Sequence, residues 1–168
     1  LLTTDYTNCT DEDNLPGNRG LIRVIRVIRG PNAWFDLGWS GLSALLRSAP
    51  MKITPHSKLV FIGDSITDCE RARPVGEGLF GALGKGYVSM VEGLLYAIRP
   101  TDAIRVVKMG MSGNTVLDLK ARWSTDVIAL KPDWLVVMIG VNDVWRQFDL
   151  PLQKEIHVSP GVYAQTLD

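Results

Sequence analysis

The sequence predicts an α/β fold in which a parallel β-sheet carries helices on both faces. From residue 58 onward, short apolar segments alternate with segments of helical spacing, and each predicted strand ends at a glycine followed by a polar loop. Repeated strand–helix–strand units join through right-handed crossovers, which place helices on both sides of the sheet. Ligands bind such sheets beyond the carboxyl ends of the strands.

The first predicted strand covers residues 58–62 (KLVFI) and ends at Gly63. A glycine-rich loop follows over residues 73–86. Residues 87–98 then place apolar side chains at helical spacing, and Pro100 predicts the end of this helix.

The second predicted strand covers residues 104–109 (IRVVKM), and residues 116–130 show the spacing of another helix, which Pro132 ends. Residues 134–139 (WLVVMI) are continuously apolar, as expected of a parallel strand buried on both faces. Residues 149–168 are predicted to hold a loop and the start of a further helix.

Residues 1–50 differ from the rest of the chain. Residues 1–20 are polar and rich in turn formers, and residues 21–30 read LIRVIRVIRG. The β-branched residues favour a strand, but a strand would place the three arginines on alternating faces, and a helix has poor propensity here. Because propensity and pattern disagree, we expect no well-specified element. We therefore divide the chain into an N-terminal extension (1–50) and a portion of the α/β domain (51–168).

The amino-acid composition argues against several classes of function. The 168 residues carry 18 basic and 18 acidic side chains, with 46% hydrophobic and 21% charged residues, which is typical of a globular domain. Balanced charge offers no basic surface for nucleic acid, and no apolar run is long enough to span a bilayer. Two cysteines make neither a disulfide framework nor a zinc site. We expect a cytoplasmic domain without nucleic-acid or membrane partners.

Small polar residues follow all three predicted strands, in the segments GDSITD (63–68), GMSGNT (110–115) and GVND (140–143). A serine at a strand-to-helix turn exposes its hydroxyl, a glycine lets a backbone N–H approach a reacting carbonyl, and an asparagine amide adds a donor. One such donor typically stabilises the transition state of acyl transfer by roughly 3–4 kcal/mol. Each residue also has a structural alternative, as a helix cap or a turn former.

The same segments resemble, in the same order, the first three sequence blocks of the SGNH (GDSL) hydrolases. The longer stretches FIGDSITD, RARPVGEGLFGALGKGYV, MSGNTVLDLKARW and IGVNDVWRQFD resemble the acetylxylan-esterase-like branch of that superfamily. The resemblance runs from about Met51 to the last residue. It implies a flavodoxin-like SGNH hydrolase fold with no cofactor and no metal.

Residue by residue, the resemblance implies that Ser65 is the nucleophile. The oxyanion donors would be the backbone N–H groups of Ser65 and Gly113 and the side chain of Asn142, while Asp64 and Asp143 would shape the loops. The implied reaction is hydrolysis of carboxylic esters through an acyl-enzyme, with acetyl groups of xylo-oligosaccharides as the implied substrate. A lysophospholipase or thioesterase of the same fold remains an alternative, and a homo-oligomer remains open.

One departure from the family concerns the general base. The family takes it from a D-x-x-H block, which this sequence does not contain; His56 and His157 stand in other contexts. We therefore expect that the C-terminal part of the fold is missing, and that loss of the base costs about 10⁴–10⁶ in rate. An inert fragment that only binds ligands is a further alternative.

The remaining motifs and single residues give weaker indications of function. Residues 76–81 read G-x-G-x-x-G but follow no predicted strand, so they do not predict a dinucleotide site. We expect Trp123, Trp134 and Trp145 in the core or an interface, and Cys69 as a small buried hydrophobic residue.

Overall fold

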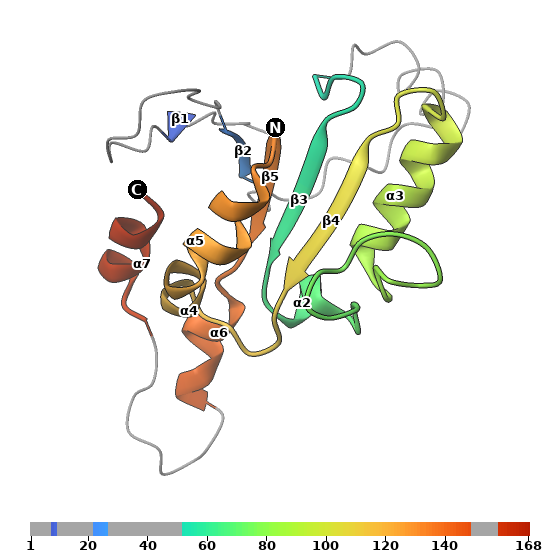
Figure 1. The fold of residues 1–168 in the computed structure, drawn as a ribbon. Helices are drawn as coiled ribbons and strands as arrows, with labels where there is room; N and C mark the ends of the chain where they lie inside the picture. Colours follow the sequence, from blue (N-terminus) through green and yellow to red (C-terminus); the bar gives the residue numbers. More distant parts are fainter. Residues whose placement is uncertain (1–7, 10–21, 27–51, 149–157) are drawn as a thin grey trace, which may run out of the picture.

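The computed structural model describes four parts of the chain: residues 8–9, 22–26, 52–148 and 158–168. Within these parts, one sheet contains strands in the order β1-β2-β5-β3-β4 (Figure 1). Strand β3 (Lys58–Gly63) lies between β4 (Arg105–Gly110) and β5 (Trp134–Met138), and both pairings are parallel. The three strands predicted from the sequence are therefore confirmed, within one residue at each end.

Strand β2 (Ile22–Arg26) contradicts the expectation that residues 21–30 form no defined element. It pairs in parallel with β5, from Arg23 beside Trp134 to Arg26 beside Val137, and β1 (Asn8–Cys9) pairs with it in antiparallel orientation. The strand propensity of the β-branched residues prevails, since the edge of β5 supplies backbone hydrogen-bond partners. Most of residues 1–51 lies outside the described residues, so the boundary at residue 50 stays a prediction.

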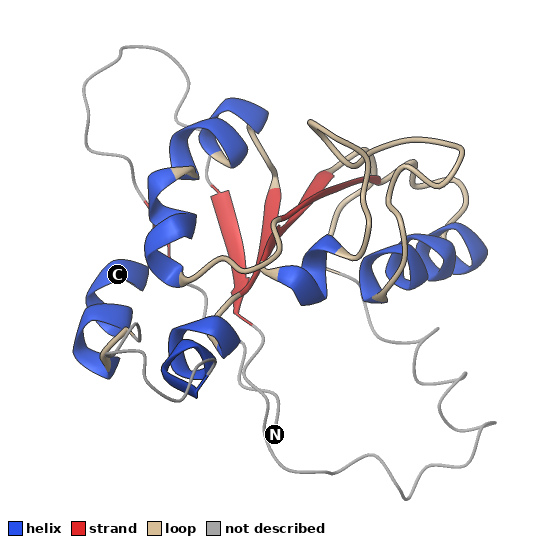
Figure 2. Ribbon diagram, turned by 90° about the horizontal axis from the view of Figure 1, so that it is seen from below, coloured by secondary structure: helices blue, strands red, loops and turns tan. Residues whose placement is uncertain are grey.

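Two apolar clusters pack against opposite faces of the sheet, because successive strand residues point to opposite faces. Leu59 and Phe61 pack with Val88 of helix α3 (Tyr87–Ile98). Val60 and Ile62 pack with helices α4 (Val116–Ala121) and α5 (Trp123–Asp126). Figure 2 shows the helices on both sides of the strands, which confirms the predicted architecture.

The helix predicted over residues 87–98 is confirmed as α3, whereas the helix predicted over 116–130 is not continuous. It is interrupted at Arg122 (φ −104°, ψ 9°) and ends in a 3₁₀ turn, Ile128–Leu130. Helix α7 (Pro160–Leu167) lies within the region where a last helix was expected. In the described ranges, no helix combines the length and the apolar character needed to cross a membrane.

Buried cations fix the glycine-rich loop against β4. Lys108 is fully buried, and its Nζ donates hydrogen bonds to the carbonyl oxygens of Leu83 (2.7 Å) and Lys85 (2.6 Å). Burial lowers the pKa of Lys108. Arg71 is also buried, and its Nε donates to the carbonyl oxygen of Gly110 (2.7 Å) at the end of β4. The loop is thus held by charge-assisted hydrogen bonds to backbone carbonyls.

Candidate active site

The carboxyl ends of β3, β4 and β5 bring three loops to one edge of the sheet. Gly63 at the end of β3 pairs with Gly110 of β4 and with Met138 of β5. In Figure 1 the arrowheads of β3 and β4 point to the edge where helix α2 (Ser65–Asp68) lies. Helix α6 (Val141–Trp145) follows the end of β5. The three polar segments therefore share this edge, as the sequence predicts.

Two glycines let these loops approach one another closely. A Cβ atom on Gly63 would lie 2.1 Å from the carbonyl oxygen of Met138, and one on Gly110 would lie 2.2 Å from the backbone nitrogen of Asp68. Both distances are too short for any side chain. The missing side chains allow α2 to pack directly across the end of β4.

Ser65 is the exposed first residue of α2. The N-cap of this helix is Asp64, whose Oδ1 accepts a hydrogen bond from the N–H of Ile66 (2.9 Å). The alternative that Ser65 itself caps the helix is therefore wrong. Among the described residues, no hydrogen bond engages the Ser65 hydroxyl or its backbone N–H. Both groups are available to a ligand at this edge.

Gly113 turns the chain after β4 with a φ of 81°, a conformation that favours glycine. Its carbonyl oxygen accepts a hydrogen bond from Nη2 of Arg146 (2.6 Å), and a Cβ atom at Gly113 would lie 2.8 Å from the same nitrogen. Within the described part of the chain, the Gly113 N–H has no hydrogen-bond partner. A second backbone donor is thus unengaged at this edge.

Asn142 lies half-buried in α6, and its Nδ2 donates a hydrogen bond to the carbonyl oxygen of Asn114 (2.9 Å). Asn114 belongs to the loop after β4, so this contact joins the second loop to the third. An asparagine amide carries two N–H groups. One fixes the side chain and the other remains as a donor.

Asp64 and Asp143 shape the loops, as expected. Oδ1 of Asp143 accepts a hydrogen bond from the N–H of Val116 (2.9 Å), while Oδ2 is buried and has no partner among the described residues. Burial raises the pKa of both carboxyl groups, and the charge of Asp143 raises that of Asp64 further. The two loops thus bring these acids near each other.

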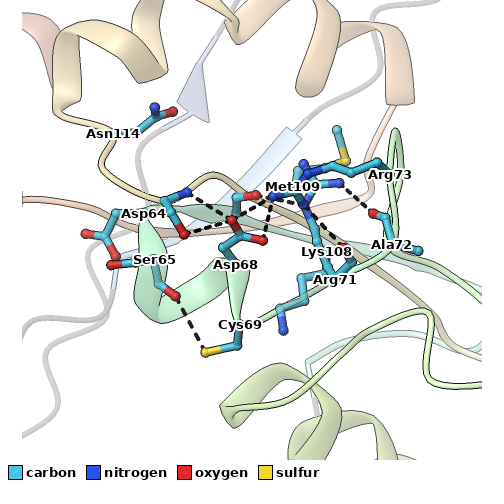
Figure 3. A network of polar contacts seen from close by, with 12 residues as sticks. Asp64, Ser65, Asp68, Cys69, Arg71, Ala72, Arg73, Lys108, Met109 and Asn114 are labelled. Carbon is cyan, nitrogen blue, oxygen red and sulfur yellow. Dashed lines mark hydrogen bonds and ion pairs between the residues drawn. The ribbon is translucent and has the colours of Figure 1, made fainter.

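Asp68 connects the first loop to the second (Figure 3). Its Oδ2 accepts hydrogen bonds from the backbone N–H (3.0 Å) and the hydroxyl (2.9 Å) of Ser112, and Nη2 of Arg73 donates to both carboxylate oxygens. Burial favours a higher pKa for Asp68, but the hydrogen bonds from Arg73 and Ser112 outweigh it and lower the pKa to about 2. Ionised Asp68 therefore fixes the residue next to Gly113.

The ionisation of Asp68 is expected to make stability depend on pH. Its pKa falls from 3.8 to about 2 on folding, so its contribution is fully present above 3.8 and is lost as the pH falls through 2. We expect about 1–2 kcal/mol, because Arg73 is half exposed. In urea, the free energy of unfolding of the protein should exceed that of Asp68→Asn near neutral pH, and this difference should shrink near pH 2. A difference independent of pH would contradict this role.

The three tryptophans among the described residues divide between the core and the surface. Trp134 is buried and Trp123 packs against the core, as expected. Trp145 is 59% exposed, so it does not lie in the core. Other exposed apolar side chains occur on the three polar segments, on α6 and on the 3₁₀ turn that follows it (Arg146–Phe148): Ile66, Met111, Val141, Val144 and Phe148. This edge therefore presents apolar surface around its polar groups.

The prediction for Cys69 is wrong, because this residue is only half-buried. Its Sγ donates hydrogen bonds to the carbonyl oxygens of Ser65 (3.5 Å) and Ile66 (3.3 Å). His56 precedes β3 and so lies at the opposite edge of the sheet, and His157 lies outside the described residues. Within the described ranges, no three His, Cys, Asp or Glu side chains are arranged to hold a metal ion.

Three further residues, which the sequence patterns did not predict, hold the site together: Asn114, Arg122 and Arg146. A signal for Arg122 was present in the sequence. Arg122 and Asp126 stand three and seven positions after Leu119, a fully buried residue, and so lie on the apolar face of the predicted helix. A charged pair on an apolar face indicates a buried polar partner.

A serine beside unengaged donors, at the carboxyl edge of a parallel sheet, is typical of α/β serine hydrolases. The chain belongs to the GDSL-like Lipase/Acylhydrolase family, whose model matches residues 61–166. This confirms the resemblance to the SGNH (GDSL) hydrolases and the predicted fold class.

Individual relatives agree with this placement. The acetylxylan esterase of Geobacillus stearothermophilus is 67% identical over 117 residues, which are 70% of this chain and 53% of that protein. The crystal structure of Axe2, an acetylxylan esterase from that organism, matches over the same shares with 67% identity and a TM-score of 0.67. LAE5, an α/β hydrolase from the metagenome of Lake Arreo in Spain, is 55% identical, with a TM-score of 0.67, over 70% of this chain and 55% of its own. The chain thus spans about half the length of these relatives.

Proposed function

We propose that this protein is a serine esterase and that Ser65 is its nucleophile. The proposal rests on the exposure and the hydrogen bonding of the Ser65 hydroxyl. Its hydroxyl is exposed and unengaged among the described residues, at the start of α2, and two further loops bring hydrogen-bond donors to the same edge. Membership of the acylhydrolase family supports an acyl group as the transferred unit.

In the proposed reaction, Oγ of Ser65 attacks the ester carbonyl and loses its proton to a general base. The carbonyl oxygen becomes negatively charged, and the N–H groups of Ser65 and Gly113 and the free amide N–H of Asn142 stabilise it. The C–O bond to the alcohol then breaks, the alcohol takes a proton, and an acyl-Ser65 ester remains. Water hydrolyses this ester by the same steps and releases a carboxylic acid.

The proposed substrate class is acetylated xylo-oligosaccharides. Support comes from the relatives, one of which is an acetylxylan esterase with 67% identity to this chain. The exposed Trp145 lies three residues after Asn142 on α6, and the surrounding edge is partly apolar. Such a surface suits the apolar face of a sugar ring next to the reacting ester.

Covalent labelling with a fluorophosphonate tests the nucleophile. The reagent phosphonylates nucleophilic serines. Because the family's D-x-x-H block does not occur among these 168 residues, imidazole is added as the proton acceptor, and we expect one label on the peptide that contains Ser65 after long incubation with excess reagent. Ser65→Ala should abolish the label, whereas Ser124→Ala, at an exposed serine of α5, should keep it. A label that persists in Ser65→Ala, or no label on the unaltered protein, would overturn the proposal.

Competition against the same reagent tests the substrate class. Acetylated xylo-oligosaccharides should slow the labelling of Ser65, while the deacetylated sugars should slow it much less. A lysophospholipid or a thioester that protects Ser65 better than the acetylated sugars would contradict the proposed substrate.

A further inference from the structure

Arg122 occupies the interruption between α4 and α5, and its guanidinium group reaches the carboxyl edge of the sheet. Nη2 donates to the carbonyl oxygen of Gly63 (2.9 Å) at the end of β3, and Nη1 donates to that of Met109 (2.8 Å) near the end of β4. The side chain is only 11% exposed, and it forms an ion pair with Asp126 (2.7 Å). One side chain thus joins the ends of two strands.

The third contact of Arg122 leads to the candidate oxyanion donors. Its Nε donates to Oδ1 of Asn114 (2.7 Å), and the carbonyl oxygen of the same Asn114 accepts the amide of Asn142 (2.9 Å). Asn114 also directly follows Gly113, whose N–H is the second backbone donor. Gly63, whose carbonyl oxygen binds the same guanidinium group, stands two residues before Ser65. Arg122 therefore contacts a residue close to each of the three donors.

This role requires an arginine. A guanidinium group presents five N–H donors in one rigid plane, whereas a lysine ammonium is a compact charge on a flexible stem. The oxygens of Gly63, Met109 and Asn114 come from three different segments. A lysine could keep the ion pair with Asp126 but not all three of these contacts at once.

We propose that Arg122 is a positioning residue that aligns the oxyanion donors of Ser65, Gly113 and Asn142 through its contacts with Gly63, Met109 and Asn114. The proposal rests on the proposed function, since it assumes that these donors act on an oxyanion. Arg122 itself does not touch the reacting atoms. Misplacement of catalytic groups by about 1 Å can slow a reaction by about a hundredfold, which sets the scale of the expected effect.

The kinetics of fluorophosphonate labelling test this role. In Arg122→Gln we expect the maximal labelling rate to fall about ten- to a hundredfold, with little change in the half-saturating reagent concentration. Arg122→Lys should not restore the rate, although it would do so if the ion pair with Asp126 were all that mattered. Arg99→Gln removes a comparable Arg–Asp pair at the end of α3 and should label at the normal rate.

An NMR measurement makes the test independent of reactivity. The side-chain amide signals of Asn142, assigned by their loss in Asn142→Asp, should shift in Arg122→Gln and stay in place in Arg99→Gln. Asn114→Ala removes the side-chain amide that Arg122 binds but keeps the backbone carbonyl that binds Asn142, and it should shift the same signals. This variant covers the case in which Arg122→Gln does not fold.

The outcomes separate the two proposals. Failure of the unaltered protein to label at Ser65 would overturn the proposed function. Asn142 amide signals that do not move in Arg122→Gln or Asn114→Ala, or a labelling rate that Arg122→Lys fully restores, would overturn the role of Arg122. Shifted signals together with a reduced labelling rate in both Arg122→Gln and Arg122→Lys would support it.

Discussion

Asn142→Ala is expected to slow the phosphonylation of Ser65 by about 10²–10³-fold, the effect of removing one oxyanion donor. One N–H of the Asn142 amide donates to the carbonyl oxygen of Asn114 and holds the side chain in place. In the proposed mechanism, the other N–H binds the substrate oxygen. Truncation removes this donor, so the charge that develops on the phosphonyl or carbonyl oxygen loses a partner in the transition state.

Gln165→Ala provides the matched control, because Gln165 is an exposed amide on α7. It should label at the same rate as the unaltered protein, and circular dichroism should show that both variants fold. If Asn142→Ala labels within about twofold of the unaltered protein, Asn142 is not an oxyanion donor, and its role is confined to the contact with Asn114.

The 168-residue chain is expected to hydrolyse p-nitrophenyl acetate about 10⁴–10⁶-fold more slowly than the Geobacillus esterase. The D-x-x-H block, from which the family takes its general base, does not occur among these 168 residues. The oxyanion donors alone sustain a small residual rate. Initial rates, with the rate of Ser65→Ala subtracted, measure this residual activity.

Imidazole in solution can test whether the general base is what limits this rate. A small base that reaches Ser65 should raise the Ser65-dependent rate in proportion to its concentration, because it replaces the missing proton acceptor. Ser65-dependent turnover close to that of the relative, without imidazole, would show that a base is already present within these residues.

The spacing of apolar residues along the chain predicted the strands and the helix that depend mainly on residues close in sequence. Apolar runs ending in glycine identified β3, β4 and β5, and helical spacing closed by Pro100 identified α3. The edge that carries Ser65 followed from the topology, because parallel strands that are neighbours in a sheet end on the same side.

The side-chain contacts that hold the loops at the carboxyl ends of the strands could not be predicted from such patterns. Arg122 lies where the helix predicted over residues 116–130 is interrupted, and it donates to the carbonyl oxygen of Gly63, 59 positions earlier in the chain. Asp68 similarly binds Ser112, 44 positions later. Such long-range pairings of side chains with backbone depend on the assembled fold, so periodicity and propensity do not predict them.

In the proposed mechanism, these long-range contacts have one consequence in common. Asp68 fixes Ser112, Arg146 fixes Gly113, and Arg122 fixes Asn114, so successive residues of one loop are each held by a charged side chain or its hydrogen bonds. Donors that are held in place before the substrate arrives need no reorganisation during the reaction, which is the condition for effective oxyanion stabilisation.

Trapping of the acyl group on the protein shows whether Ser65 accepts it. An activated acetyl ester carries a good leaving group and therefore acylates a serine more readily than water removes the acetyl group, so long incubation with such an ester should leave acetyl-Ser65 in place. Peptide mass spectrometry should then find one acetyl group on the Ser65 hydroxyl and none at that peptide in Ser65→Ala. An unmodified Ser65, or the same acetylation of that peptide in Ser65→Ala, would contradict the claim.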